Sequence, residues 1–125
     1  MAEQKAVDTV KKELKKKGRE MFNIHGSAYG SKQGKPDIFS TDKNGRFMGI
    51  EVKARSGKPY PNQIRRGREI VEFNNGRYVI AYEDFDIEKV DNYEIPRVLY
   101  ENEDMKFPKV TCELVLDESQ VTYNG

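Results

Sequence analysis

The 125-residue chain has one cysteine, one histidine and no tryptophan. Because Cys112 has no second cysteine to pair with, an intrachain disulfide and a cysteine-rich zinc site are excluded, and a reducing, cytosolic setting fits. A single histidine argues against hydrolases that need several histidines and against a Ser-His-Asp triad. His25 ends a candidate strand, where we expect a structural or solvent-facing side chain rather than a catalytic one.

Long apolar runs are also missing. No stretch approaches the length of a membrane span, and the N-terminal residues lack the apolar segment of a signal peptide. A hydrophobic content of 36% and a charged content of 34% describe a polar chain. At this length we expect a single domain with one core and no membrane partner.

The net charge of +1 conceals an uneven distribution of charge along the chain. Residues 1–77 carry 18 Lys and Arg against 9 Asp and Glu, whereas residues 78–125 carry 4 against 12. A basic segment joined to an acidic one indicates that the basic part meets a polyanion. The two halves can instead neutralise each other within the fold or across a dimer. We favour the polyanion, because the basic half also contains the candidate site.

That site lies in residues 34–53, for which the pattern predicts a short strand carrying Asp37, a turn at residues 42–45 and a strand over residues 46–54. Asn44-Gly45 favours the turn because both residues tolerate a positive φ. Side chains alternate between the faces of a strand. One face therefore presents Met48, Ile50, Val52 and Ala54, and the other presents Phe47, Gly49, Glu51 and Lys53.

Pairing of these two strands brings Asp37 beside Glu51. Adjacent carboxylates repel each other, and a shared proton or a bound cation relieves the repulsion. Mg²⁺ prefers such oxygen ligands, and the backbone carbonyl of Val52 offers another. Lys53, on the same face as Glu51, can orient a water or neutralise charge on a phosphate. The alternative is a surface hairpin in which Glu51 and Lys53 form a weak ion pair.

An amphipathic helix is predicted over residues 3–17, with Val7, Val10 and Leu14 on one stripe. Glu3 lies one turn before that stripe. Its carboxylate either binds a metal or points into solvent at a frayed helix start, where its negative charge interacts favourably with the helix dipole. Glu13 is the competing ligand if the helix is rotated. The lysines at positions 11, 12, 15, 16 and 17 form a solvated face that can also touch a phosphate backbone.

The remaining pattern predicts a strand over residues 21–25, a loop over 26–35, a helix over 62–73 and a strand over 77–82. The Pro59-Tyr60-Pro61 segment stiffens the turn into the helix, and Gln63 lies in its first turn. Residues 83–91 are acidic and have room for one helical turn. Apolar and polar residues alternate over 110–116, which predicts a last strand. Residues 85–125 contain no motif that we can interpret.

Pro36-Asp37 followed by Glu51-Val52-Lys53 resembles the PD-(D/E)xK nuclease signature. More narrowly, the sequences SKQGKPDI (31–38), IEVK (50–53) and GRYVI (76–80), together with Gln63, resemble the VRR-NUC (virus-type replication-repair nuclease) branch. The resemblance covers about residues 3–82. Residues 83–125 then form an acidic C-terminal extension of the single 1–125 domain, packed on the core or on a dimer partner.

This resemblance implies a restriction-endonuclease-like α/β core, in which helices flank a mixed sheet of about four strands. It also implies a metal-dependent deoxyribonuclease that binds Mg²⁺ or Mn²⁺ through Glu3, Asp37, Glu51 and the Val52 carbonyl. Lys53 would position or activate water, and Gln63 would support it. The basic side chains expected to contact DNA are Lys32, Lys35, Arg55, Lys58, Arg65, Arg66 and Arg68.

Small stand-alone members of this branch are similar to Holliday-junction resolvases, act as homodimers and are frequent in phage. The resemblance therefore implies branched or flap DNA as the substrate, a homodimer, and the cytoplasm of a bacterium or a phage-infected cell. Two features depart from the family pattern: Lys35 replaces the usual apolar residue before the proline, and the acidic tail lies outside the resemblance. The alternative is a nucleic-acid-binding or assembly module that keeps the fold without turnover.

Overall fold

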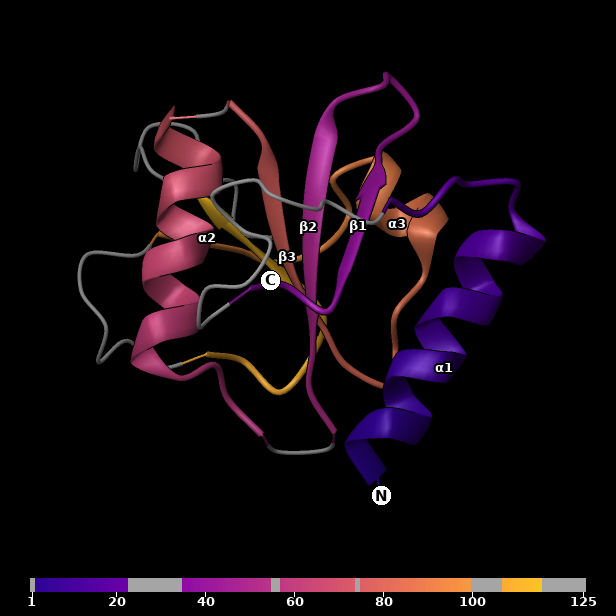
Figure 1. The fold of residues 1–125 in the computed structure, drawn as a ribbon, viewed down its shortest axis with the longest axis horizontal. Helices are drawn as coiled ribbons and strands as arrows, with labels where there is room; N and C mark the ends of the chain where they lie inside the picture. The colour runs from indigo at the N-terminus through magenta and orange to yellow at the C-terminus, as the bar shows by residue number, and fades with distance from the viewer. Residues whose placement is uncertain (1, 23–34, 55–56, 74, 100–106, 116–125) are drawn as a thin grey trace.

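The computed structural model describes residues 2–22, 35–54, 57–73, 75–99 and 107–115, and it forms one sheet between helices (Figure 1). In chain order the elements are α1 (Ala2–Lys16), β1 (Ile38–Thr41), β2 (Phe47–Val52), α2 (Pro61–Phe73), β3 (Arg77–Ala81), α3 (Ile87–Asp91), β4 (Arg97–Leu99) and β5 (Cys112–Val115). The predicted α/β class, with helices flanking a mixed sheet, is confirmed.

The sheet has five strands in the order β1-β2-β3-β5-β4. β1 and β2 form an antiparallel hairpin, and α2 makes the crossover from β2 to its parallel neighbour β3. β5 then runs antiparallel to β3 and parallel to β4. β3, which corresponds to the predicted strand over residues 77–82, lies at the centre of the sheet, and its residues are all buried.

Two apolar clusters cover the two faces of the sheet. On one face, Val7, Val10 and Leu14 of α1 and Ile87 and Val90 of α3 pack on the sheet residues Met48, Ile50, Val52, Val79 and Ala81. On the other face, Ile64 and Ile70 of α2 pack on Tyr78, Ile80, Cys112 and Leu114. Figure 1 shows α1 and α2 on opposite sides of the strands. The predicted alternation in β2 therefore holds, with Met48, Ile50 and Val52 on the α1 side.

Local sequence explains where α1 ends and where the chain turns between β1 and β2. Gly18 adopts φ +74°, and the N–H groups of Gly18 and Arg19 donate to the carbonyls of Lys15 and Leu14, a glycine-terminated helix end. In the β1–β2 turn, Gly45 has φ +82° and Asp42 Oδ1 accepts from the N–H groups of Asn44 and Arg46.

The C-terminal part of the chain extends this core rather than only covering it. Ile87, Val90 and Ile95 belong to the cluster under α1, and β5 inserts between β3 and β4. The predicted last strand, 110–116, is observed as β5. β4 and β5 thus complete the sheet, although residues 85–125 contain no recognised motif.

Several ion pairs join the basic and acidic halves of the sequence. Lys17 pairs with Glu88 at 2.9 Å, and Arg19 pairs with Asp91. Arg77, which is 1% exposed, pairs with Glu113 at 2.7 Å through its Nε. Part of the uneven charge is therefore neutralised within the fold, which is the alternative we did not favour from sequence.

Other predicted elements differ in extent. α2 begins at Pro61 itself, because proline suits the first helical position. Of the predicted 21–25 strand, Phe22 forms an isolated bridge to Phe39, and residues 23–25 lie outside the described residues, as does most of the 26–35 loop. Among the described helices, none is both long and apolar enough to cross a bilayer.

Candidate metal centre

The register of the first hairpin places Asp37 next to Glu51. Ile38 pairs with Ile50, so the preceding and following residues lie at the same end of the two strands. Pro36 sits against Gly49, where an added Cβ would lie 3.0 Å from the proline ring and 2.9 Å from Ile70. Only glycine fits this close approach without displacement. Pro36 and Gly49 thus set the position of the residue that follows the proline.

Asp37 is tied to the neighbouring strand by its side chain. One carboxylate oxygen, Oδ2, accepts a hydrogen bond of 2.8 Å from the backbone N–H of Val52. This bond replaces a ladder bond at the end of the hairpin and fixes the Asp37 side chain against β2. It also holds the backbone of Val52, whose carbonyl is the fourth predicted ligand, beside the carboxylates.

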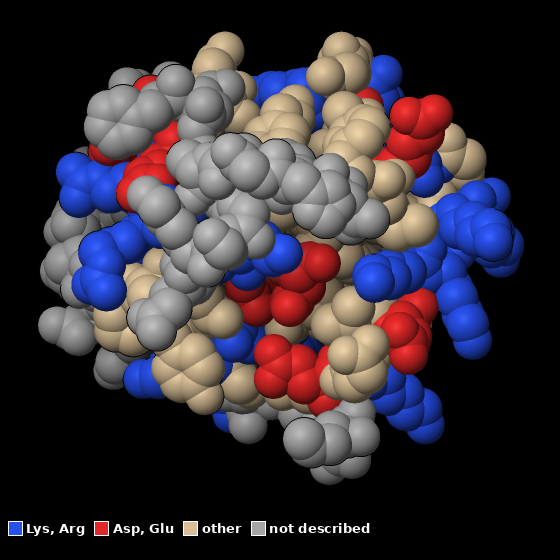
Figure 2. Space-filling model, viewed as in Figure 1, with Lys and Arg blue, Asp and Glu red and all other residues tan. Residues whose placement is uncertain are grey.

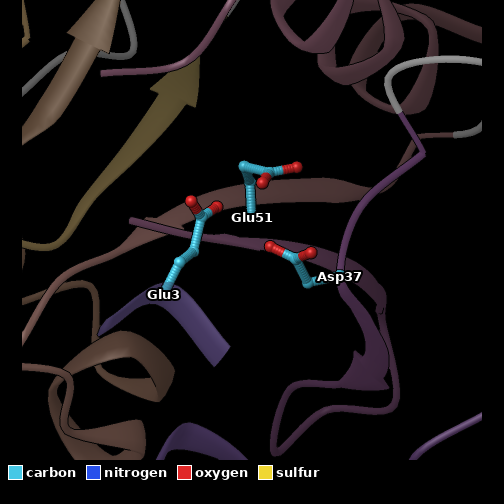
Figure 3. Close-up of side chains that lie close together, drawn as sticks. All are labelled: Glu3, Asp37 and Glu51. Atoms are coloured by element: carbon cyan, nitrogen blue, oxygen red, sulfur yellow. The ribbon is translucent and has the colours of Figure 1, made fainter. Parts of the chain in front are cut away.

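Glu3 reaches the same place from the first turn of α1. One carboxylate oxygen from each of Glu3, Asp37 and Glu51 lies within 4.8 Å of the others (Figure 3). The first turn of α1, the residue before β1 and strand β2 therefore supply one group of oxygens. Glu13, the alternative candidate on α1, instead accepts a hydrogen bond from the N–H of Ile87 at 3.2 Å, and so serves the start of α3.

The carboxyl group of Glu51 is almost fully buried, with the residue 1% exposed. Burial, and then the hydrogen bond with and the charge of Asp37, raise the pKa of Glu51 to about 10. Its Oε1 has no hydrogen-bond partner among the described residues. A buried, unpartnered carboxylate oxygen beside two more carboxyl groups suits a divalent cation. The cation relieves the repulsion between the carboxylates and gives the buried oxygen a partner.

Lys53 brings an ammonium group close to two of these acids. Its Nζ lies 3.9 Å from Glu3 Oε1 and 3.9 Å from Glu51 Oε2, and its side chain is 5% exposed. The same Nζ lies 4.7 Å from the ring centroid of Tyr60. The predicted position of Lys53, on the face of β2 that carries Glu51, is confirmed.

Gln63 makes a different contact from the one predicted. Its side-chain Oε1 accepts a hydrogen bond of 2.8 Å from the backbone N–H of Tyr60, the residue before Pro61. This is the reciprocal half of a capping box, in which the third residue of a helix reaches back to the capping residue. Gln63 therefore stabilises the start of α2 and is linked to Lys53 through Tyr60.

The predicted DNA-contacting residues divide into three groups. Lys32 and Arg55 lie outside the described residues. Lys35, Lys58 and Arg65 are exposed. Arg66 pairs with Glu69, and Arg68 pairs with Glu72 at 2.8 Å. Acidic residues of α2 itself therefore partly neutralise these two guanidinium groups. On the face of the molecule shown in Figure 2, acidic side chains near the middle lie among Lys and Arg side chains.

Two tyrosines near the centre were not recognised from sequence as part of it. Tyr60 was interpreted only as part of a stiff turn. Tyr78 is fully buried and its hydroxyl has no hydrogen-bond partner in the described part of the chain. Burial, and then the charges of Glu51 and Asp37, raise its pKa well above the usual value. The Tyr78 ring packs against Gly67 of α2, where an added Cβ would lie 2.4 Å from the ring. A glycine inside a predicted helix was the sequence clue to this close packing.

Comparisons of the chain with models of protein families, with curated proteins and with solved structures gave no match. An assignment of function therefore depends on the motif resemblance and on the geometry described above.

Proposed function

We propose that this protein is a divalent-metal-dependent DNA endonuclease. The observation that carries the proposal is the meeting of Glu3, Asp37 and Glu51, with the ammonium group of Lys53 lying 3.9 Å from Glu3 and from Glu51. Hydrolysis of a phosphodiester needs a centre that stabilises negative charge and a group that positions the attacking water. This arrangement offers acidic ligands for the first need and an ammonium group for the second.

The donor set fits a hard cation such as Mg²⁺ or Mn²⁺, since it consists of oxygen atoms. Glu3, Asp37, Glu51 and the Val52 carbonyl are the groups that would hold it. When bound, such an ion acts as a Lewis acid that lowers the pKa of water and offsets charge on the phosphate. No cofactor besides this ion is required.

The protein's own groups have distinct tasks in this proposal. Asp37 and Glu51 are held by the hairpin, so their oxygens need little reorganisation. The side chain of Glu3 is 54% exposed and marks the solvent side of the centre, from which a phosphate can approach. The side chain of Lys53 is 5% exposed, and its ammonium group orients the attacking water and balances negative charge in the transition state.

DNA is the proposed substrate because of the nuclease motif and the basic first part of the chain. Branched substrates, either four-way junctions or flaps, follow from the resemblance alone. A homodimer is proposed with them, because two symmetric cuts need two sites related by a twofold axis. A DNA nuclease of this kind, of phage type, would act in the cytoplasm.

The test is cleavage of a labelled panel consisting of a four-way junction, a flap, a linear duplex and a single strand. Each is incubated with Mg²⁺, Mn²⁺ or EDTA. We expect metal-dependent nicking that Lys53→Ala reduces by roughly 10²- to 10⁴-fold, the range for a group that assists proton transfer. Lys89→Ala, which removes the same charge from the exposed surface of α3, should cleave like the wild type.

Three outcomes would contradict the proposed metal-dependent nuclease. Cleavage that persists in EDTA, or that Lys53→Ala leaves unchanged, would point to another centre or a contaminant. Binding of the junction with no cleavage of any substrate would favour a binding or assembly module that keeps the fold. In that case Asp37→Asn should leave DNA affinity unchanged.

A further inference from the structure

Tyr60 places an exposed aromatic ring at the edge of the metal centre. The residue is 66% exposed, whereas the other exposed large apolar residues in the described ranges, Met21, Phe22 and Val110, are 38–39% exposed. The ring centroid lies 4.7 Å from Nζ of Lys53, which itself lies 3.9 Å from two of the carboxylates. One ammonium group therefore separates this ring from the candidate metal ligands.

The backbone that carries the ring is held on both sides. Tyr60 stands between Pro59, which is buried, and Pro61, the first residue of α2. Its N–H donates to Gln63 Oε1 at 2.8 Å. Its carbonyl accepts from the N–H groups of Gln63 at 2.9 Å and Ile64 at 3.1 Å. A large apolar side chain left in water on such a rigid support has low conformational entropy to lose on binding a ligand.

The position of Lys53 also leaves a flat surface available. Its ammonium lies over the ring, an attractive cation–π arrangement. Lys53 lies over one face of the ring, and the residue as a whole remains 66% exposed. A flat, electron-rich surface of this kind binds another π-system by stacking.

We propose that Tyr60 is a stacking platform for a nucleobase next to the phosphate bound at the metal centre. The inference rests on the proposed DNA nuclease function and narrows its substrate. A base that stacks on a protein ring has to leave its neighbours in the DNA stack, and this is easiest where it is unpaired. Tyr60 thus selects strands with unpaired nucleotides at the cleavage point, such as flaps, branch points and single strands, over continuous duplex.

The first experiment measures binding in Ca²⁺, a hard cation that takes oxygen ligands, using a labelled single strand and the duplex of the same sequence. Base–aromatic stacking predicts that Tyr60→Ala weakens single-strand binding by roughly 5- to 150-fold. Tyr60→Phe should bind like the wild type, because the ring remains. Tyr60→Leu, which still covers Lys53 without a π-face, should resemble Tyr60→Ala. Duplex binding should change little in all three variants.

The second experiment identifies the stacked base. An abasic nucleotide is placed at each position of the single strand in turn, and each strand is tested against the wild type and Tyr60→Ala. At one position, removal of the base should weaken wild-type binding by the same factor as Tyr60→Ala, and combining the two changes should add nothing further. Full additivity at every position would overturn the proposal, as would equal losses for single strand and duplex.

These binding measurements separate the two proposals. If the wild type cleaves no DNA but the abasic series shows the non-additive position, the platform stands and the nuclease fails. If the wild type cleaves DNA but Tyr60→Leu binds single strands as tightly as the wild type, the nuclease stands and the platform is wrong.

Discussion

The carboxylate of Asp37 accepts a 2.8 Å hydrogen bond from the backbone N–H of Val52, at the end of the β1–β2 hairpin. This bond ties the Asp37 carboxylate to the sheet, and one carboxylate oxygen of Asp37 lies within 4.8 Å of oxygens of Glu3 and Glu51. A local hydrogen bond thus orients a candidate metal ligand before any ion arrives, which is the preorganisation that electrostatic catalysis needs.

Asp37→Asn should separate the structural role of this side chain from its ligand role. The asparagine still offers an oxygen to the N–H of Val52, so the fold should be retained, with an unchanged circular dichroism spectrum. The lost charge should weaken Mn²⁺ binding by roughly tenfold or more, as measured by calorimetry. Asp8→Asn, the same change at an exposed position of α1, is the matched control. Equal Mn²⁺ affinity in both variants would exclude Asp37 as a ligand.

Glu51→Gln should stabilise the metal-free protein at neutral pH. The pKa of Glu51 is raised from 4.5 to about 10 in the folded protein, mainly by burial, so folding favours the protonated form. In the wild type this group's contribution to stability is therefore full below pH 4.5 and is lost as the pH rises towards 10. Glutamine removes that loss, and at pH 7 it should raise the free energy of unfolding by about 2–3 kcal/mol.

The measurement is urea unfolding of the metal-free protein across this pH range. The wild type should lose stability with rising pH, and Glu51→Gln should show a flatter profile. Added Mn²⁺ should stabilise the wild type more than the variant, since a ligand stabilises only the state that binds it. Parallel pH profiles for the two proteins would show that Glu51 titrates normally.

Arg77 and Glu113 form a buried ion pair that joins β3 to β5. The guanidinium donates to both carboxylate oxygens of Glu113, to the carbonyl of Val90 and to Asp42, and neither partner is more than 2% exposed. Arg77→Met removes the guanidinium from both buried acids and leaves Glu113 with Arg97, whose Nε lies 3.6 Å away. It should lower the free energy of unfolding by about 3–5 kcal/mol. Arg77→Met/Glu113→Leu should recover part of that loss in urea unfolding.

A surface pair provides the comparison. Lys17 and Glu88 lie 2.9 Å apart with both side chains exposed, so Lys17→Ala should change stability far less than Arg77→Met. If the two single variants unfold at the same urea concentration, the buried pair is not a stabilising link between the two strands.

Cys112 should be inert in the folded protein. Its side chain is buried, and burial raises the pKa of the thiol to about 12. Because the thiolate is the reactive form, modification by a disulfide reagent at pH 8 should be slow in buffer and fast in denaturant. Rapid labelling without denaturant would indicate that β5 opens readily.

Much of the centre could be predicted from local patterns. Alternation along residues 46–54 put Glu51 and Lys53 on one face, and the Asn44-Gly45 turn implied the pairing that brings Asp37 alongside. Glu3 was ambiguous, because one helical stripe is compatible with either Glu3 or Glu13. The structure decides between them, since Glu13 accepts from the N–H of Ile87, a partner in a segment that no motif connected to α1.

The sequence by itself determined the hairpin, the two long helices, the strand over residues 77–82 and the shared face of Glu51 and Lys53. These features depend on side-chain periods and turn preferences that act over a few residues. Only the tertiary structure decided that Glu3 joins Asp37 and Glu51, that β5 enters the sheet between β3 and β4, and that Tyr60 stands exposed beside Lys53. Such contacts depend on how whole elements pack, because they join residues that are far apart in the chain or on separate elements.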